Sequence, residues 1–139
     1  MEALSVVAKD ALPAGAIIPW VTPLAMNYTT PATIFYGSYT PNDIYRSTDR
    51  RDNWENIGGS GFHDIITCPS NVNRMYAVSD NVIRRSDNIL ITAASVTWTT
   101  ISSNTKFPIL PNGVGVSRLS VNPANSTIFS FVKEVIPKI

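Results

Sequence analysis

The sequence has little charge, one cysteine and one histidine. The single cysteine, Cys68, excludes an intramolecular disulfide bond and a metal site built from cysteines. The net charge of +1 provides no basic field that would attract nucleic acid or an anionic membrane. No stretch approaches the roughly 20 apolar residues of a membrane-spanning helix. The sequence also contains no glycine-rich phosphate-binding loop and no calcium-binding loop. We therefore expect no metal, no cofactor, no nucleic-acid partner and no membrane span.

What the sequence contains favours strands and tight turns. Charged residues make up 15% of the chain and apolar residues 44%. Threonine, serine, asparagine and proline are frequent, and apolar residues do not recur at the spacing of three and four that marks a helix. β-Branched and aromatic residues dominate the apolar segments, as is typical of strands. The composition therefore predicts an all-β fold.

An internal repeat organises these strands. The predicted strands of the first copy span residues 24–27, 33–36, 43–47 and 54–57, those of the second 65–68, 74–77, 82–86 and 98–101, and those of a third 119–122 and 127–130. Equivalent positions are separated by 75 − 34 = 41, 86 − 47 = 39 and 98 − 54 = 44 residues. A unit of four antiparallel strands that repeats every ~40–45 residues is typical of a propeller blade.

The repeat also divides the chain. Residues 1–19 are expected to form an N-terminal arm or an outer strand, residues 20–60 the first repeat and residues 61–102 the second. Residues 103–116, rich in proline and glycine, are expected to be a linking loop, and residues 117–139 a partial third repeat.

The loop after the third strand of the first copy carries a recognisable motif. Its sequence, Ser-Thr-Asp-Arg-Arg-Asp-Asn-Trp at residues 47–54, resembles the Asp-box, or bacterial neuraminidase repeat, S-x-D-x-G-x-x-W. Ser47, Asp49 and Trp54 match the defining side chains, whereas Arg51 stands at the glycine position. If that position needs a positive φ, the arginine is strained. In the second copy we assign the same structural role to Ser86, Asp87 and Trp98, in a loop five residues longer.

The resemblance implies a partial β-propeller of about two and a half blades, as in sialidase, xyloglucanase and sortilin-type proteins. A closed propeller needs about four to eight blades, so remaining blades or self-association would have to cover the open sheet edges. The family is common in exported proteins, which implies a secreted or cell-surface location. The first ten residues do not read as a secretion signal, because the start is acidic and Lys9 and Asp10 interrupt a short apolar run.

Three residues are candidate ligand contacts. His63 and Asp64 lie at the start of the second copy, at an end of the inner strands that lines a binding face in many propellers, an argument from fold analogy alone. Trp20 has no equivalent in the other copies and is a candidate surface contact. Arg46 and Arg85 occupy matching positions beside the two serines, which indicates a recurring structural or solvent-facing role.

No catalytic residue is predicted. The aspartates that could supply a glycosidase pair lie largely in turns, at positions 43, 49, 52, 64, 80 and 87. The sequence therefore favours a non-catalytic binding or scaffold fragment with a carbohydrate or protein ligand. One alternative is a fragment of a glycoside hydrolase whose active site needs residues outside this chain. Another is a photosystem-assembly or sortilin-like receptor propeller that binds a protein.

Overall fold

The computed structural model describes residues 22–60, 63–79, 82–102 and 114–135. Within these ranges the chain forms antiparallel sheets of four, four and two strands, and its one helical segment is a 3-10 turn, η1, at Ala93–Ser95. The all-β prediction is confirmed. Residues 1–19, the candidate contact Trp20 and most of the predicted linking loop lie outside the described residues.

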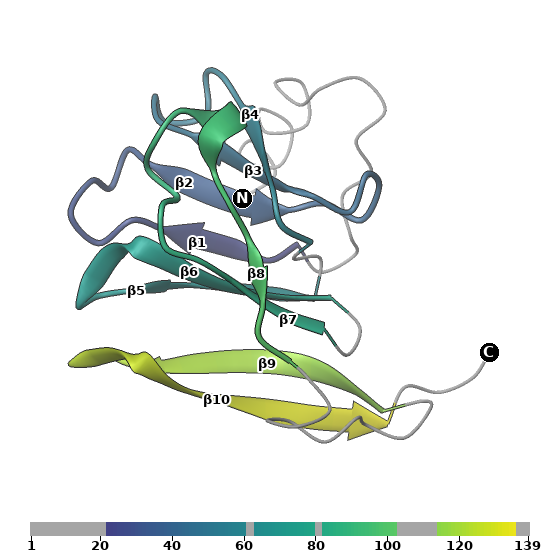
Figure 1. The fold of residues 1–139 in the computed structure, drawn as a ribbon. Helices are drawn as coiled ribbons and strands as arrows, with labels where there is room; N and C mark the ends of the chain where they lie inside the picture. Colours follow the sequence, from purple (N-terminus) through teal and green to yellow (C-terminus); the bar gives the residue numbers. More distant parts are fainter. Residues whose placement is uncertain (1–21, 61–62, 80–81, 103–113, 136–139) are drawn as a thin grey trace.

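The strands follow one another along the chain in each sheet (Figure 1). The first sheet contains β1 (Leu24–Met26), β2 (Ile34–Gly37), β3 (Ile44–Ser47) and β4 (Glu55–Gly58). The second contains β5 (Asp64–Cys68), β6 (Asn71–Ser79), β7 (Val82–Ser86) and β8 (Thr99–Thr100), and the third β9 (Val114–Asn122) and β10 (Asn125–Val135). The observed strands overlap the predicted ones in every case. The main differences are that β6 and β10 are longer than predicted and that β9 begins inside the predicted linking loop.

Asparagine side chains shape the turn between the first two strands in the first and the third sheets. Asn27 Oδ1 accepts hydrogen bonds from the backbone N–H groups of Thr29 and Thr30, each at 3.0 Å. Asn122 Oδ1 accepts from Ala124 N at 2.9 Å in the turn between β9 and β10. An asparagine that replaces a backbone acceptor in this way favours a turn over a continued strand.

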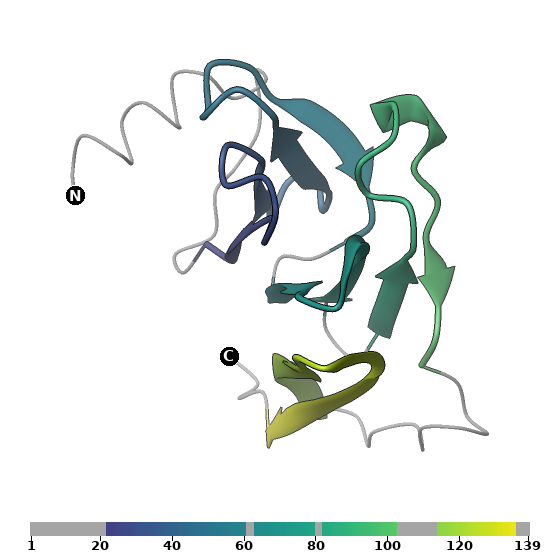
Figure 2. The same cartoon turned by 90° about the vertical axis from the view of Figure 1, so that its left-hand side faces the viewer.

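The three sheets are stacked, and the second lies between the other two (Figure 1). The first strands of the sheets are neighbours, since β1 contacts β5 and β5 contacts β9. The view in Figure 2, turned by 90°, shows β8 and η1 on the side of the stack away from these first strands. The side chain of Asn27 joins two sheets directly, because its Nδ2 donates to the carbonyl of Val72 at 3.0 Å.

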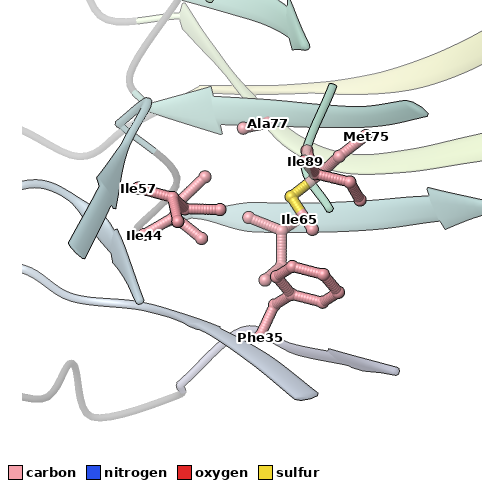
Figure 3. Close-up of a cluster of buried hydrophobic side chains, with 7 residues drawn as sticks. All are labelled: Phe35, Ile44, Ile57, Ile65, Met75, Ala77 and Ile89. Atoms are coloured by element: carbon pink, nitrogen blue, oxygen red, sulfur yellow. The ribbon is translucent and has the colours of Figure 1, made fainter. Parts of the chain in front are cut away.

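Each contact between sheets encloses an apolar cluster. Between the first and second sheets the buried residues are Phe35, Ile44, Ile57, Ile65, Met75, Ala77 and Ile89 (Figure 3). Between the second and third sheets they are Cys68, Tyr76, Val78, Ile83 and Leu119. A fully buried side chain of this size contributes about 1.5–3 kcal/mol through the hydrophobic effect, so these clusters hold the stack together.

Candidate functional site

The loop of residues 47–54 is held by a serine and an aspartate. The hydroxyl of Ser47 donates to Asp49 Oδ1 at 2.8 Å and accepts the backbone N–H of Arg51 at 2.8 Å. Asp49 Oδ1 also accepts the backbone N–H of Asn53 at 2.9 Å, and Asp49 Oδ2 accepts from the Asn53 side chain at 2.6 Å. The two side chains therefore satisfy the backbone N–H groups of Arg51 and Asn53 within this loop.

These hydrogen bonds fix the charge of Asp49. The side-chain amide of Asn53, its backbone N–H and the Ser47 hydroxyl stabilise the carboxylate and lower the pKa of Asp49 from 3.8 to about 2. A carboxyl group with so low a pKa is ionised near neutral pH and is a poor proton donor there. In this loop the carboxylate serves as a hydrogen-bond acceptor.

The backbone of the same loop is strained at two arginines. Arg50 has φ 60° and Arg51 has φ 89°. Positive φ is uncommon for residues that carry a Cβ, and glycine adopts it readily. The glycine position of the motif is therefore occupied by an arginine in the backbone conformation that glycine favours. The match of residues 47–54 to the Asp-box pattern predicted this strain at Arg51 if the position needs a positive φ.

An aromatic group lies behind the loop. The ring of Trp54 meets the ring of Tyr36 edge-on at 5.0 Å, and Tyr36 stacks on Tyr45 at 5.1 Å with an angle of 10° between the rings. Burial raises the pKa of Tyr36. The Trp54 Nε1 atom is buried and has no hydrogen-bond acceptor in the part of the chain that the structure describes.

The loop of residues 86–98 repeats this arrangement with an asparagine in place of the aspartate. The hydroxyl of Ser86 donates to Asn88 Oδ1 at 3.0 Å, and Asn88 Oδ1 accepts the backbone N–H of Thr97 at 3.0 Å. Thr97 precedes Trp98 as Asn53 precedes Trp54. The extra residues of this loop include the η1 turn, and Asn88 Nδ2 donates to the carbonyl of Ser95 at 3.3 Å.

Asp87, which the sequence pointed to for this role, makes different contacts. Its carboxylate pairs with Arg74 Nε and, at 3.0 Å, with Arg85 Nε. Sequence reasoning missed Asn88 because it looked for an acid. The repeat offset contained the signal, since 88 − 49 equals 86 − 47.

The second tryptophan covers the end of the first sheet. Trp98 Nε1 donates to the carbonyl of Ile57 at 2.7 Å. A Cβ atom at Gly59, where φ is 96°, would lie 2.7 Å from Trp98 Cε2, so the ring packs directly on the glycine backbone. Trp98 thus contacts the preceding sheet, whereas the described ring partner of Trp54 is Tyr36 in its own sheet.

Arg46 connects the same two sheets. Its side chain lies in β3, is buried, and donates from Nη1 to the carbonyls of Ile89 at 2.7 Å and Ile91 at 2.6 Å. Nη2 pairs with Glu55 at 2.8 Å. Of the two roles left open by the sequence, the structural one applies to Arg46, because a solvent-facing arginine would not be buried at 4% exposure. Arg85, at the equivalent position, is more exposed and pairs with Asp87.

The candidate ligand contact Asp64 ties the second sheet to the third. Its Oδ2 accepts the backbone N–H of Leu119 at 2.8 Å, and its Oδ1 accepts that of Ile65 at 3.0 Å. Burial raises the pKa of Asp64, although these N–H groups and Arg118 act in the opposite direction. His63, which precedes it, donates its backbone N–H to Val78 at 3.2 Å. The third candidate, Trp20, lies outside the described residues, so the structure does not bring the three together.

Other chemistry-bearing groups are not assembled into a site. Cys68 is buried, and burial raises the pKa of its thiol to about 11. Among the described residues, no three histidine, cysteine or acidic side chains are grouped as metal ligands would be. The same part of the chain has no helix with the length and hydropathy needed to cross a membrane.

No model of a known protein family matches this chain, and a search of curated proteins finds no relative. The Asp-box resemblance therefore depends on the residues of the two loops and on their contacts.

Proposed function

We propose that this chain is a non-catalytic scaffold or binding module of an Asp-box, β-propeller-type protein. The observation that supports the proposal most strongly is the recurrence of one hydrogen-bonded clamp in two loops. In each loop a serine hydroxyl donates to a side-chain oxygen two residues later, and that oxygen accepts the N–H of the residue before a tryptophan. The clamp persists although the second loop is longer, which is expected if its role is to hold the sheet.

The contacts of the aspartates also support a scaffold. Asp43 Oδ2 accepts from Asn56 at 2.9 Å, and Asp49 is saturated by its own loop. Asp64 binds a backbone N–H of the neighbouring sheet, and Asp87 pairs with two arginines. A glycosidase needs two carboxyl groups that face a common substrate. These four carboxylates are each engaged in holding a turn or a strand.

The proposal is tested by separating turnover from binding. The purified protein is assayed for hydrolysis of sialosides and xyloglucan, and for binding on an array of glycans and immobilised peptides. We expect no hydrolysis above the blank. Asp49→Asn, Asp64→Asn and Asp87→Asn should change the melting temperature without removing binding to any ligand that the array identifies. Hydrolysis that disappears in one of these three variants, while the variant stays folded, would contradict the proposal.

A further inference from the structure

The sequence contains two segments of the form Asn-x-Thr. One is Asn-Tyr-Thr at residues 27–29, directly after β1, and the other is Asn-Ser-Thr at residues 125–127, at the start of β10. This pattern is the acceptor signal for N-linked glycosylation when the middle residue is not proline and the asparagine lies on the surface. Because the pattern is short, the exposure and the hydrogen bonds of each asparagine decide whether it can react.

The two asparagines have the same local hydrogen bonds. Asn27 Oδ1 accepts the backbone N–H and the hydroxyl of Thr29, each at 3.0 Å. Asn125 Oδ1 accepts the backbone N–H of Thr127 at 3.0 Å and its hydroxyl at 2.6 Å. In both segments the threonine hydroxyl therefore holds the amide oxygen of the asparagine. What distinguishes the two is the amide nitrogen, Nδ2, which is the atom that a glycan would join.

The two amide nitrogens have unlike surroundings. Asn27 is 2% exposed, and its Nδ2 donates to the carbonyl of Val72 in the second sheet at 3.0 Å. A reaction at this nitrogen would break a contact between two sheets. Asn125 is exposed, and its Nδ2 makes no hydrogen bond to another described residue. Of the two amide nitrogens, only that of Asn125 is accessible in the folded chain.

The residue between Asn125 and Thr127 fixes the exposed pair to the rest of the protein. Ser126 is 8% exposed, its carbonyl accepts the Tyr76 hydroxyl at 2.6 Å, and its own hydroxyl accepts Arg74 Nη1 at 3.2 Å. Asn125 and Thr127 on either side are exposed, as are the two residues that precede them in the turn. The second sheet thus anchors the middle of the segment, while the surrounding exposed residues leave room for a glycan on Asn125.

We propose that Asn125 is the acceptor site for an N-linked glycan on the folded chain and that Asn27, despite the same sequence pattern, is not. The donor is a glycosyl diphosphate, carried on a lipid or on a nucleoside, and a glycosyltransferase catalyses the step. Asn125 Nδ2 forms a bond to the anomeric carbon of the sugar, and the bond from that carbon to the diphosphate oxygen breaks. The diphosphate leaves with the electron pair, and one amide proton passes to a base of the transferase. This modification is independent of the proposed scaffold function.

The test offers both kinds of donor to the folded protein. In one arm the purified chain is incubated with a single-subunit oligosaccharyltransferase and a lipid-linked oligosaccharide, and in the other with a soluble N-glycosyltransferase and a uridine diphosphate sugar. Intact mass spectrometry counts the glycans, and peptide mapping locates them. We expect one glycan, at Asn125, in at least one arm, with occupancy at Asn27 lower by about tenfold or more because its Nδ2 is bonded and buried. The arm that reacts identifies the source of the sugar.

Matched controls separate the sequence pattern from the fold. Asn125→Gln should remove the glycan, and Thr127→Ala should lower the occupancy of Asn125 by about tenfold or more because the pattern needs the hydroxyl. Thr127→Ser keeps the hydroxyl and should restore occupancy. Synthetic peptides of residues 22–32 and 120–130 contain the two patterns without the fold, so both should be modified to a similar extent.

Several outcomes would overturn the proposal. They are absence of a glycan at Asn125 in both arms, equal occupancy of Asn27 and Asn125 in the folded protein, and an unmodified peptide of residues 120–130. If the peptide that contains Asn27 also remained unmodified, the sequence and not the fold would exclude Asn27, which would contradict the structural argument. An unchanged melting temperature of each variant shows that the chain stays folded during the assay. None of these results alters the scaffold function, because that function is tested by hydrolysis and binding.

Discussion

The substitution Arg46→Met tests whether the stack depends on hydrogen bonds between its sheets. Arg46 is 4% exposed and binds the carbonyls of Ile89 and Ile91 through Nη1. Methionine fills similar volume but cannot donate, so at least the carbonyl of the fully buried Ile89 loses its charged partner. Hydrogen bonds to charged groups contribute about 1.5–3 kcal/mol each, which gives a loss of about 3–6 kcal/mol for the pair. The bridge to Glu55 adds little, because the Glu55 side chain is half exposed.

Urea denaturation followed by tryptophan fluorescence measures this loss, since Trp98 lies on the same interface. The matched control is Arg85→Met, at the equivalent repeat position. Arg85 pairs with Asp87 at a half-exposed site, so this change should cost less than about 1 kcal/mol. Equal losses for Arg46→Met and Arg85→Met would refute the reasoning, because burial and the two carbonyls are what distinguish the positions.

Three further predictions concern the loop of residues 47–54. Ser47→Ala should lower the free energy of unfolding by about 1–3 kcal/mol because it removes the acceptor of the half-buried Arg51 N–H. Thr48→Ala, at an exposed position, should be neutral in the same denaturation assay. Arg51→Gly should raise stability by about 0.5–1 kcal/mol, because relief of strain at φ 89° exceeds the entropy that glycine adds to the unfolded chain; Arg51→Ala, which keeps a Cβ, should bring no such gain. Because the pKa of Asp49 is lowered to about 2, the ionised carboxylate contributes fully to folding stability above the unfolded pKa of 3.8, and this contribution is lost as the pH falls through about 2. Asp49→Asn should therefore reduce the fall of the melting temperature with decreasing pH in this range, and an unchanged fall would contradict the prediction.

The strands and turns were predictable because their signals are local. Asn27 and Asn122 set turns through hydrogen bonds that span two or three residues, and residues that alternate along each strand face opposite sides. The repeat offset then placed the second sheet once the first was recognised. All of this information lies within about 45 residues of sequence.

The contacts between sheets were harder to predict, because they join residues far apart in the chain. Nothing near Arg46 in the sequence shows that the carbonyl of Ile89 will meet its guanidinium, so a charge beside a loop could equally face solvent. In the same way Asp64 reads as an exposed acid, although its carboxylate receives the N–H of Leu119. The prediction of a propeller depends on the rotation between successive sheets, which these non-local contacts determine.

The comparison of the two loops shows which property of the motif matters. Asp49 and Asn88 differ in charge, but each places Oδ1 between a serine hydroxyl and the N–H that precedes a tryptophan. The two loops therefore share a side-chain oxygen two residues after the serine, but they do not share a negative charge at that position. The aspartate gains a second bond to the Asn53 side chain, and the asparagine gains one to the carbonyl of Ser95. A search for an acidic residue alone therefore selects Asp87 as the equivalent of Asp49, whereas the hydrogen-bond geometry of the loop identifies Asn88.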